Sequence, residues 1–250
     1  MDKRDISNFT NYYYHLYQPI FCVHNWSLFG YEILLRHPNF SSASTLFKWA
    51  KKEKKSIDID FLSIEKAIRM MVMKPKQSSL IFINVYPRTL LDARWPIFIK
   101  NLVKNLNLDT DKIVFELNEE YSYLGTNEMC KLKMTIKHLR QLKFKVALDD
   151  VGRNPTSLQK IDFLDSDFIK LDKSLSKNLA NSSEKQYVVE SVIKFKKDKK
   201  IILEGVEEPT DLAMAKLIGI DMVQGYLLGK PDMHRYDILK IEDFFKREQF

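Results

Sequence analysis

Short apolar runs that alternate with stretches of helical periodicity constrain the fold of this chain more than any other feature. The runs are rich in branched and aromatic residues, which favours strands. Between them, apolar residues recur three and four positions apart, as on one face of a helix. The predicted strands are 12–23, 28–36, 80–85, 112–117, 144–149, 167–171, 200–203 and 222–224. The predicted helices are two within 44–73 and one each over 95–106, 127–142, 158–164, 184–197, 210–218 and 236–248.

Strands that alternate with helices pair in parallel, because each helix carries the chain back to the starting edge of the sheet. With eight such strands and no Ser- or Gly-rich linker in 250 residues, the simplest closure is one TIM-like (β/α)8 barrel of the α/β class. Too few residues separate 12–23 from 28–36 for a crossover helix, so this pair forms an antiparallel hairpin. We therefore expect a single domain over 1–250, with an antiparallel first strand and a core at about 12–235.

A polar residue stands at or near the end of almost every predicted strand. These residues are Glu32, Asn84, Glu116, Asp149 with Asp150, Lys170, Glu204 and Gln224. Any one of them alone is a helix cap, a turn residue or a surface charge as readily as a site residue. In a barrel, however, these ends converge on one face, where gathered acids repel one another unless cations compensate them. Oxygen donors favour Mg²⁺ or Mn²⁺ over zinc, so the series predicts a metal site.

Composition narrows the classes of protein further. No apolar run is long enough to span a bilayer and no signal peptide is present, so we expect a cytoplasmic protein without membrane contact. The two cysteines form neither a metal motif nor a disulfide framework. The net charge of +7 keeps nucleic-acid binding open as an alternative. Its lysine-rich runs, 48–55 and 194–200, are typical of solvated helix faces, and the chain shows no recognisable nucleic-acid-binding module, so we expect no nucleic-acid partner.

The motifs that carry these residues, taken in order, resemble the EAL domain, a bacterial family of cyclic di-GMP phosphodiesterases. The resemblance covers about residues 17–231. YEILLR at 31–36 is similar to the Glu-Ala-Leu-Leu-Arg signature, with Ile33 in place of alanine. The other matching segments are YQPIF at 17–21, FINVYPRTL at 82–90, FELNEE at 115–120, FIKLDKSL at 168–175, LEGVEE at 203–208 and VQGYLLGKP at 223–231.

The resemblance implies a role for each position. It implies two divalent ions, Mg²⁺ or Mn²⁺, held by Glu32, Asn84, Glu116, Asp149 and Asp150. It makes Lys170 and Glu204 catalytic, with Lys170 holding the attacking water and Glu204 acting as a further ligand or as a base. Gln18, Arg36 and Gln224 are expected at the substrate, with Gln224 also supporting the polar network. Glu207 is expected to steady the loop beside the two aspartates.

The expected reaction is the hydrolysis of cyclic di-GMP to linear pGpG, and a homodimer is the expected assembly. Two ions lower the pKa of a bound water and clamp the attacking and leaving oxygens of an in-line displacement. Arg36 can hold a phosphate with two parallel hydrogen bonds, which a lysine does not reproduce.

The sequence departs from the family directly after the two aspartates. DDVGRNPTSL at 149–158 stands where the family has Asp-Asp-Phe-Gly-Thr-Gly-Tyr-Ser-Ser-Leu. In the family this loop supports the second metal and takes part in dimer contacts. The changes over Val151–Pro155 therefore leave an alternative open: a catalytically weak or inactive domain that binds cyclic di-GMP, or a partner protein, as a signalling module. Retention of every metal-ligand position favours the enzyme.

Overall fold

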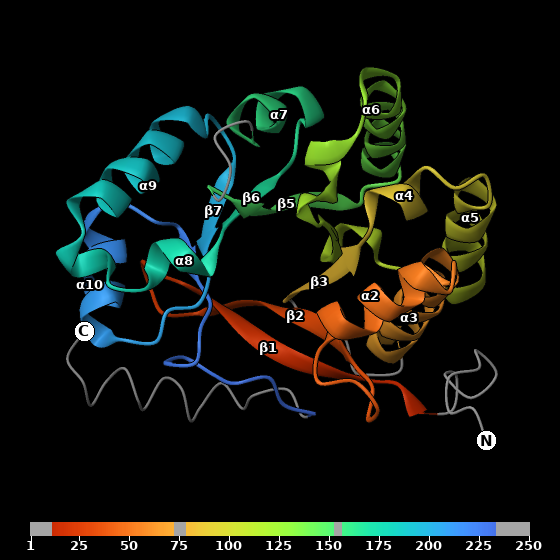
Figure 1. Cartoon of the computed structure of the whole chain (residues 1–250), viewed down its shortest axis with the longest axis horizontal. Coiled ribbons are helices and arrows are strands. Elements are labelled where there is room, and N and C mark those ends of the chain that lie inside the picture. The colour runs from red at the N-terminus through yellow and green to blue at the C-terminus, as the bar shows by residue number, and fades with distance from the viewer. Residues whose placement is uncertain (1–11, 73–78, 153–156, 234–250) are drawn as a thin grey trace.

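The eight strands form a closed barrel in chain order (Figure 1). The computed structural model describes residues 12–72, 79–152 and 157–233. The strands are β1 (Tyr14–Cys22), β2 (Leu28–Arg36), β3 (Leu80–Val85), β4 (Ile113–Leu117), β5 (Lys145–Val151), β6 (Phe168–Leu171), β7 (Lys200–Leu203) and β8 (Met222–Val223). β1 is antiparallel to both β2 and β8, and all other neighbours are parallel. The predicted (β/α)8 barrel with an antiparallel first strand is confirmed.

Helices surround this barrel. They are α2 (Ala43–Lys52), α3 (Ser56–Val72), α4 (Pro87–Leu90), α5 (Trp95–Leu106), α6 (Thr126–Gln141), α7 (Ser157–Leu164), α8 (Lys173–Ser176), α9 (Ser183–Phe195) and α10 (Pro209–Leu217). The predicted helices over these longer elements are confirmed with shifted ends. α4, α8 and the three short 3₁₀ turns were missed, because a single turn is too short to display a period. The predicted helix 236–248 lies outside the described residues.

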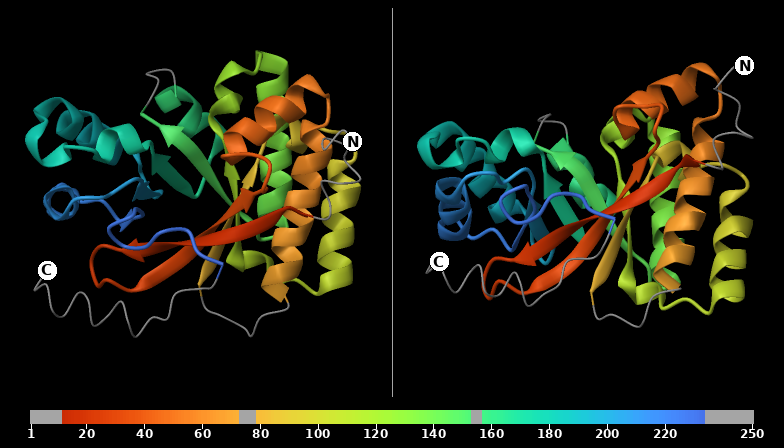
Figure 2. Two further views of the ribbon diagram at one scale, coloured as in Figure 1. Left: turned by 60° about the horizontal axis from the view of Figure 1, so that its bottom comes forward. Right: turned by 90° about the horizontal axis from the view of Figure 1, so that it is seen from below.

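Barrel closure depends on short pairings along the edge of β1 that faces away from β2. β8 contributes only two residues, which pair with Phe21 and Cys22. Further along β1, the backbones of Tyr17 and Asp232 exchange two hydrogen bonds of 2.7 and 3.0 Å. Figure 2 shows the last described residues running beside the β1–β2 hairpin. Of the helices that the structure describes, none is long and apolar enough to cross a membrane.

The barrel interior begins with a layer of apolar side chains. This layer contains Ile20, Phe82, Val114, Ala147, Phe168, Ile202 and Met222. Residues of the opposite parity on the same strands point outward and pack beneath the helices in the largest hydrophobic cluster. Because side chains on a strand alternate between faces, the residue two positions beyond each interior residue points into the barrel again. That rule fixes which side chains form the next layer.

Candidate metal centre

The next interior layer is polar. On β3 to β8, each member lies two positions beyond an apolar interior residue, on the strand or directly after its end. On the antiparallel β1 the direction is reversed, and Gln18 precedes Ile20 and stands opposite Glu32 of β2. The layer consists of Gln18, Glu32, Asn84, Glu116, Asp149, Lys170, Glu204 and Gln224. The structure thus brings eight of the predicted site residues to the same end of the barrel.

Lys170 occupies the centre of this layer and is completely buried. Its Nζ contacts the carboxylates of Glu116 and Glu204 directly. It also lies 3.2 Å from Glu32 Oε2 and 3.8 Å from Asp149 Oδ1. Burial by itself would lower the pKa of Lys170, but the surrounding carboxylates raise that pKa well above its usual value. Lys170 is therefore a charged ammonium.

One ammonium does not neutralise the four carboxylates around it. Burial, followed by the charge of Glu32, raises the pKa of Glu116 well above its usual value. Burial is also the main reason for the raised pKa of Asp149. It likewise raises the pKa of Glu204, to about 8. Glu116 Oε2 is buried and has no hydrogen-bond partner among the residues that the structure describes. The layer therefore favours additional cations or protons.

Amide side chains hold Glu32 from both sides. Asn84 Nδ2 donates to Glu32 Oε1 at 2.9 Å, and Gln224 Nε2 donates to Glu32 Oε2 at 2.7 Å. Gln224 Nε2 also lies 3.1 Å from Gln18 Oε1, and Gln18 Nε2 donates to the carbonyl of Gly229 at 3.2 Å. Burial opposes ionisation of Glu32, but Lys170 and the amide donors outweigh it and lower its pKa. Glu32 is thus an oriented anion.

Asp149 and Asp150 reach the same region because β5 is irregular. The sequence predicted that the strand ends at Asp149, which is wrong: β5 continues to Val151, and its register with β6 shifts between Leu148 and Val151. Asp150 adopts a left-handed backbone with φ of 55°, and its amide donates to Asp149 Oδ1 at 2.9 Å. Burial, followed by the charge of Asp149, raises the pKa of Asp150 to about 7. The substitutions predicted to matter at 153–155 lie outside the described residues.

Two groups of carboxylates are close enough to hold ions. Oxygens of Glu32, Glu116 and Glu204 lie within 4.8 Å of one another, as do those of Asp149, Asp150 and Glu204. Asn84 donates its hydrogen bond through Nδ2, which leaves its amide oxygen available as a further metal ligand. All of these ligands are hard oxygen atoms, which suit Mg²⁺ or Mn²⁺. Glu204 belongs to both groups, and Glu116 Oε2 has no hydrogen-bond partner among the described residues, so it is available to an ion. The donor set therefore fits two divalent ions.

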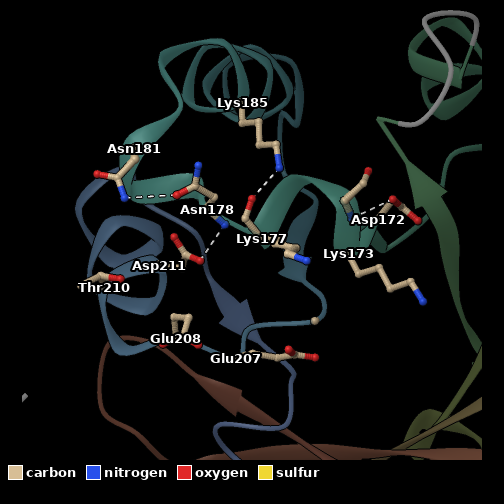
Figure 3. A pocket seen from close by; sticks show the side chains of 12 residues that line it. Asp172, Lys173, Lys177, Asn178, Asn181, Lys185, Glu207, Glu208, Thr210 and Asp211 are labelled. Atoms are coloured by element: carbon tan, nitrogen blue, oxygen red, sulfur yellow. Dashed lines mark hydrogen bonds between the residues drawn. The ribbon is translucent and has the colours of Figure 1, made fainter.

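Besides Asp150, two predicted residues lie outside the polar layer. Arg36 ends β2 on the same strand face as Glu32, is half-buried, and donates to the carbonyl of Leu35 at 2.9 Å. Glu207 is exposed and lines a pocket of about 900 Å³ with residues that include Lys173 and Lys177. Figure 3 shows this pocket between α8, α9, α10 and the loop after β7. The substrate role of Arg36 and the loop-supporting role of Glu207 stay predictions.

Sequence reasoning missed Asp172. This residue is buried, and its side chain accepts a hydrogen bond from the amide of Ser174 at 2.8 Å, which caps α8. A hydrogen bond also joins its carboxyl group to that of Asp150. The signal was present in the sequence, since Asp172 follows Lys170 by two positions at a strand end.

Comparison with known families agrees with this geometry. The model of the EAL domain matches residues 10–231. The chain belongs to the EAL domain family. Cyclic di-GMP phosphodiesterase PdeF of Escherichia coli K12 is 27% identical over 80% of this chain and 28% of its own length. Cyclic di-GMP phosphodiesterase PdeL of the same strain is 29% identical over 86% of this chain and 61% of its own length. The chain thus spans only part of these relatives.

Solved structures share the fold. The EAL domain of FimX from Pseudomonas aeruginosa, bound to c-di-GMP, superposes with a TM-score of 0.80 at 25% identity, over 92% of this chain and 95% of that domain. A manganese and cyclic di-GMP complex of Klebsiella pneumoniae BlrP1 gives 0.78 at 21% identity, over 89% of this chain and 61% of that one. The likeness to BlrP1 shows the fold alone.

Proposed function

We propose that this EAL domain hydrolyses cyclic di-GMP to linear pGpG with two divalent ions, Mg²⁺ or Mn²⁺. The observation that carries the proposal is the buried layer of carboxylates around Lys170, in which Glu204 belongs to both candidate ion-binding groups. The names of PdeF and PdeL as cyclic di-GMP phosphodiesterases support the reaction. Calcium and manganese complexes of BlrP1 support the use of divalent ions in this family.

The proposed ligands are the five residues predicted from the sequence, with Glu204 as a sixth that both groups share. When bound, the ions would supply a water of lowered pKa and electrostatic stabilisation of the attacking and leaving oxygens. Lys170 remains charged, so it donates a hydrogen bond to the attacking water and does not accept its proton. Glu204 lies against the same ammonium and acts either as this shared ligand or as the proton acceptor.

The amide and guanidinium groups complete the proposed site. Gln224 orients Glu32 and is hydrogen-bonded to Gln18, and the proposal places both glutamines at the cyclic dinucleotide. Arg36 donates to the backbone through Nη1, and its guanidinium has further N–H groups that can donate to a phosphate. We also expect a homodimer, which light scattering coupled to size-exclusion chromatography tests.

The second candidate is a cyclic di-GMP receptor without turnover. It is favoured by the changed sequence that follows Asp149 and Asp150, where Val151, Arg153, Asn154 and Pro155 replace the residues usual in the family. Both candidates require cyclic di-GMP to bind. They differ only in whether the bound diester is cleaved.

One assay separates them. Purified protein is incubated with cyclic di-GMP and either Mn²⁺, Mg²⁺ or a chelator, and pGpG is followed by chromatography. We expect metal-dependent pGpG, and a loss of two or more orders of magnitude in rate for Glu32→Ala. The matched control is Glu65→Ala, which removes a half-buried carboxylate that pairs with Arg69 on α3 and should leave the rate unchanged. Binding of cyclic di-GMP without metal-dependent product would overturn the enzyme in favour of the receptor.

A further inference from the structure

The segment from the last residue of β6 to the end of α8, residues 171–176, holds the backbone on both sides of Glu204. The amide of Glu204 donates to the carbonyl of Leu171 at 3.2 Å. One residue beyond Glu204, the carbonyl of Gly205 accepts a hydrogen bond from Ser176 Oγ at 2.9 Å. The residue shared by both candidate ion-binding groups is thus fixed by contacts with a neighbouring loop.

Ser176 makes the second of these contacts from a completely buried position. Its hydroxyl also lies 2.9 Å from the carbonyl of Lys173, on the same short helix. A serine hydroxyl has one hydrogen, so the two carbonyls share a single donor. Removing it would leave the carbonyls of Lys173 and Gly205 without that donor.

The loop after β7 packs closely against α8 at this point. Gly205 has a φ of 66°, and a Cβ added there would lie 2.5 Å from Lys173 Cβ and 3.3 Å from Ser176 Oγ. The same helix, α8, also supports the other half of the site: a Cβ added at Gly152 would lie 2.6 Å from Leu175 Cδ1. Figure 3 shows Lys173 of α8, with Asp172 and Lys177 directly before and after this helix, together with Glu207 of the loop after β7.

We propose that Ser176 is a positioning residue for the metal centre. By joining the carbonyls of Lys173 and Gly205, it sets the backbone beside Glu204 and thereby the direction in which the Glu204 carboxylate enters both groups. Metal ligands must be held to about 0.5 Å, and partners of ligands typically contribute 10- to 100-fold in metal affinity. The catalytic consequence rests on the proposed function, whereas the effect on metal binding does not require turnover.

The test compares three full-length variants. Ser176→Ala removes the donor, and Ser176→Cys keeps a weaker donor of similar shape. Ser166→Ala is the matched control, because Ser166 is also buried, precedes β6 at the opposite end of the strand, and its Oγ has no partner in the described part of the chain. Calorimetry with Mn²⁺ alone measures ion binding, and hydrolysis of cyclic di-GMP is then measured against Mn²⁺ concentration.

We expect Ser176→Ala to weaken Mn²⁺ binding at least tenfold and to raise the Mn²⁺ concentration for half-maximal hydrolysis by a similar factor. Ser176→Cys should fall between Ser176→Ala and the unaltered chain, and Ser166→Ala should match the unaltered chain. Unchanged Mn²⁺ binding in folded Ser176→Ala would overturn the proposal, even with a lowered melting temperature. Should Ser176→Ala not fold, unchanged binding in Ser176→Cys and Ser166→Ala alike would overturn it. If the unaltered chain binds Mn²⁺ without hydrolysis, only the proposed function fails; if it does not bind Mn²⁺, both fail.

Discussion

Replacing Lys170 by methionine tests whether one buried ammonium holds the carboxylate layer together. At an effective dielectric constant of about 20, a charge 3.2 Å from Glu32 Oε2 gains about 5 kcal/mol, and one 3.8 Å from Asp149 Oδ1 about 4 kcal/mol. Desolvation of the ammonium offsets much of this gain, and protonation of acids in the variant limits the loss. Removing one partner of a buried ion pair costs about 3–5 kcal/mol in the free energy of unfolding, which is the loss we expect for Lys170→Met.

The assay is thermal and urea unfolding of the metal-free protein at pH 8, followed by circular dichroism. For a chain of this length, the expected loss lowers the melting temperature by about 6–20 °C. Lowering the pH should shrink the difference, because the carboxylates that lost their cation then take up protons. This sign follows from the raised pKa values of Glu116 and Glu204, which show that these acids already favour the protonated form.

Lys199→Met is the matched control. The Lys199 side chain is also buried, but its carboxylate neighbours, Asp165 and Asp198, lie 3.9 and 3.8 Å away and are exposed at 67% and 94%. Water screens such pairs, so this substitution should change the melting temperature far less. If Lys170→Met is as stable at pH 8 as Lys199→Met, the argument that Lys170 stabilises the layer by charge is refuted.

Two further predictions concern buried groups beside the site. Burial raises the pKa of Asp60 to about 7, so the ionised carboxylate costs stability as pH rises from about 4 to about 7. The Tyr86 amide donates to the Asp60 carboxylate at 2.9 Å, and Asp60→Asn keeps an acceptor for it. The variant should be more stable than the unaltered chain by about 2–4 kcal/mol at pH 8, and by little at pH 4.5. Urea unfolding at both pH values measures this, and a variant less stable at pH 8 contradicts it. A Cβ at Gly225 would lie 2.0 Å from the Val206 carbonyl oxygen, so Gly225→Ala should cost about 2 kcal/mol or more. Gly219→Ala is the control: its added Cβ would have no neighbour within 4 Å, but its φ is 88°. This variant therefore isolates the backbone cost of about 1 kcal/mol. Equal losses of stability in the two variants would show that crowding at Gly225 is unimportant.

Local pattern predicted most of the barrel and most of its polar layer. The strand period places Glu116 two positions beyond Val114 and Lys170 two beyond Phe168, on the interior face in each case. These relations are properties of neighbouring residues, so they can be seen before any strand has a partner. The antiparallel start follows similarly from the short connection between the first two strands.

Other features depend on register and close packing between distant segments. The left-handed backbone of Asp150 accompanies a register shift between β5 and β6, which no pattern within β5 specifies. α8 has four residues, too few for a period, and its contacts with Gly152 and Gly205 exist only because three strand ends meet there. The sequence-based view of β5 as ending at its aspartates was wrong for this reason.

The sequence by itself determined which side chains face the barrel interior, because alternation along a strand is a local geometric rule. It also determined the order of the motifs, and with it the EAL domain family. Only the tertiary structure decided which of those side chains touch. Burial raises the pKa of Glu204, and neighbouring carboxylates raise that of Lys170. The hydroxyl of Ser176 meets the carbonyl of Gly205. These contacts exist because barrel closure brings β4, β6 and β7 to one end. Charge and hydrogen bonding act between atoms that are close in space, and closeness in space is what the closed barrel supplies.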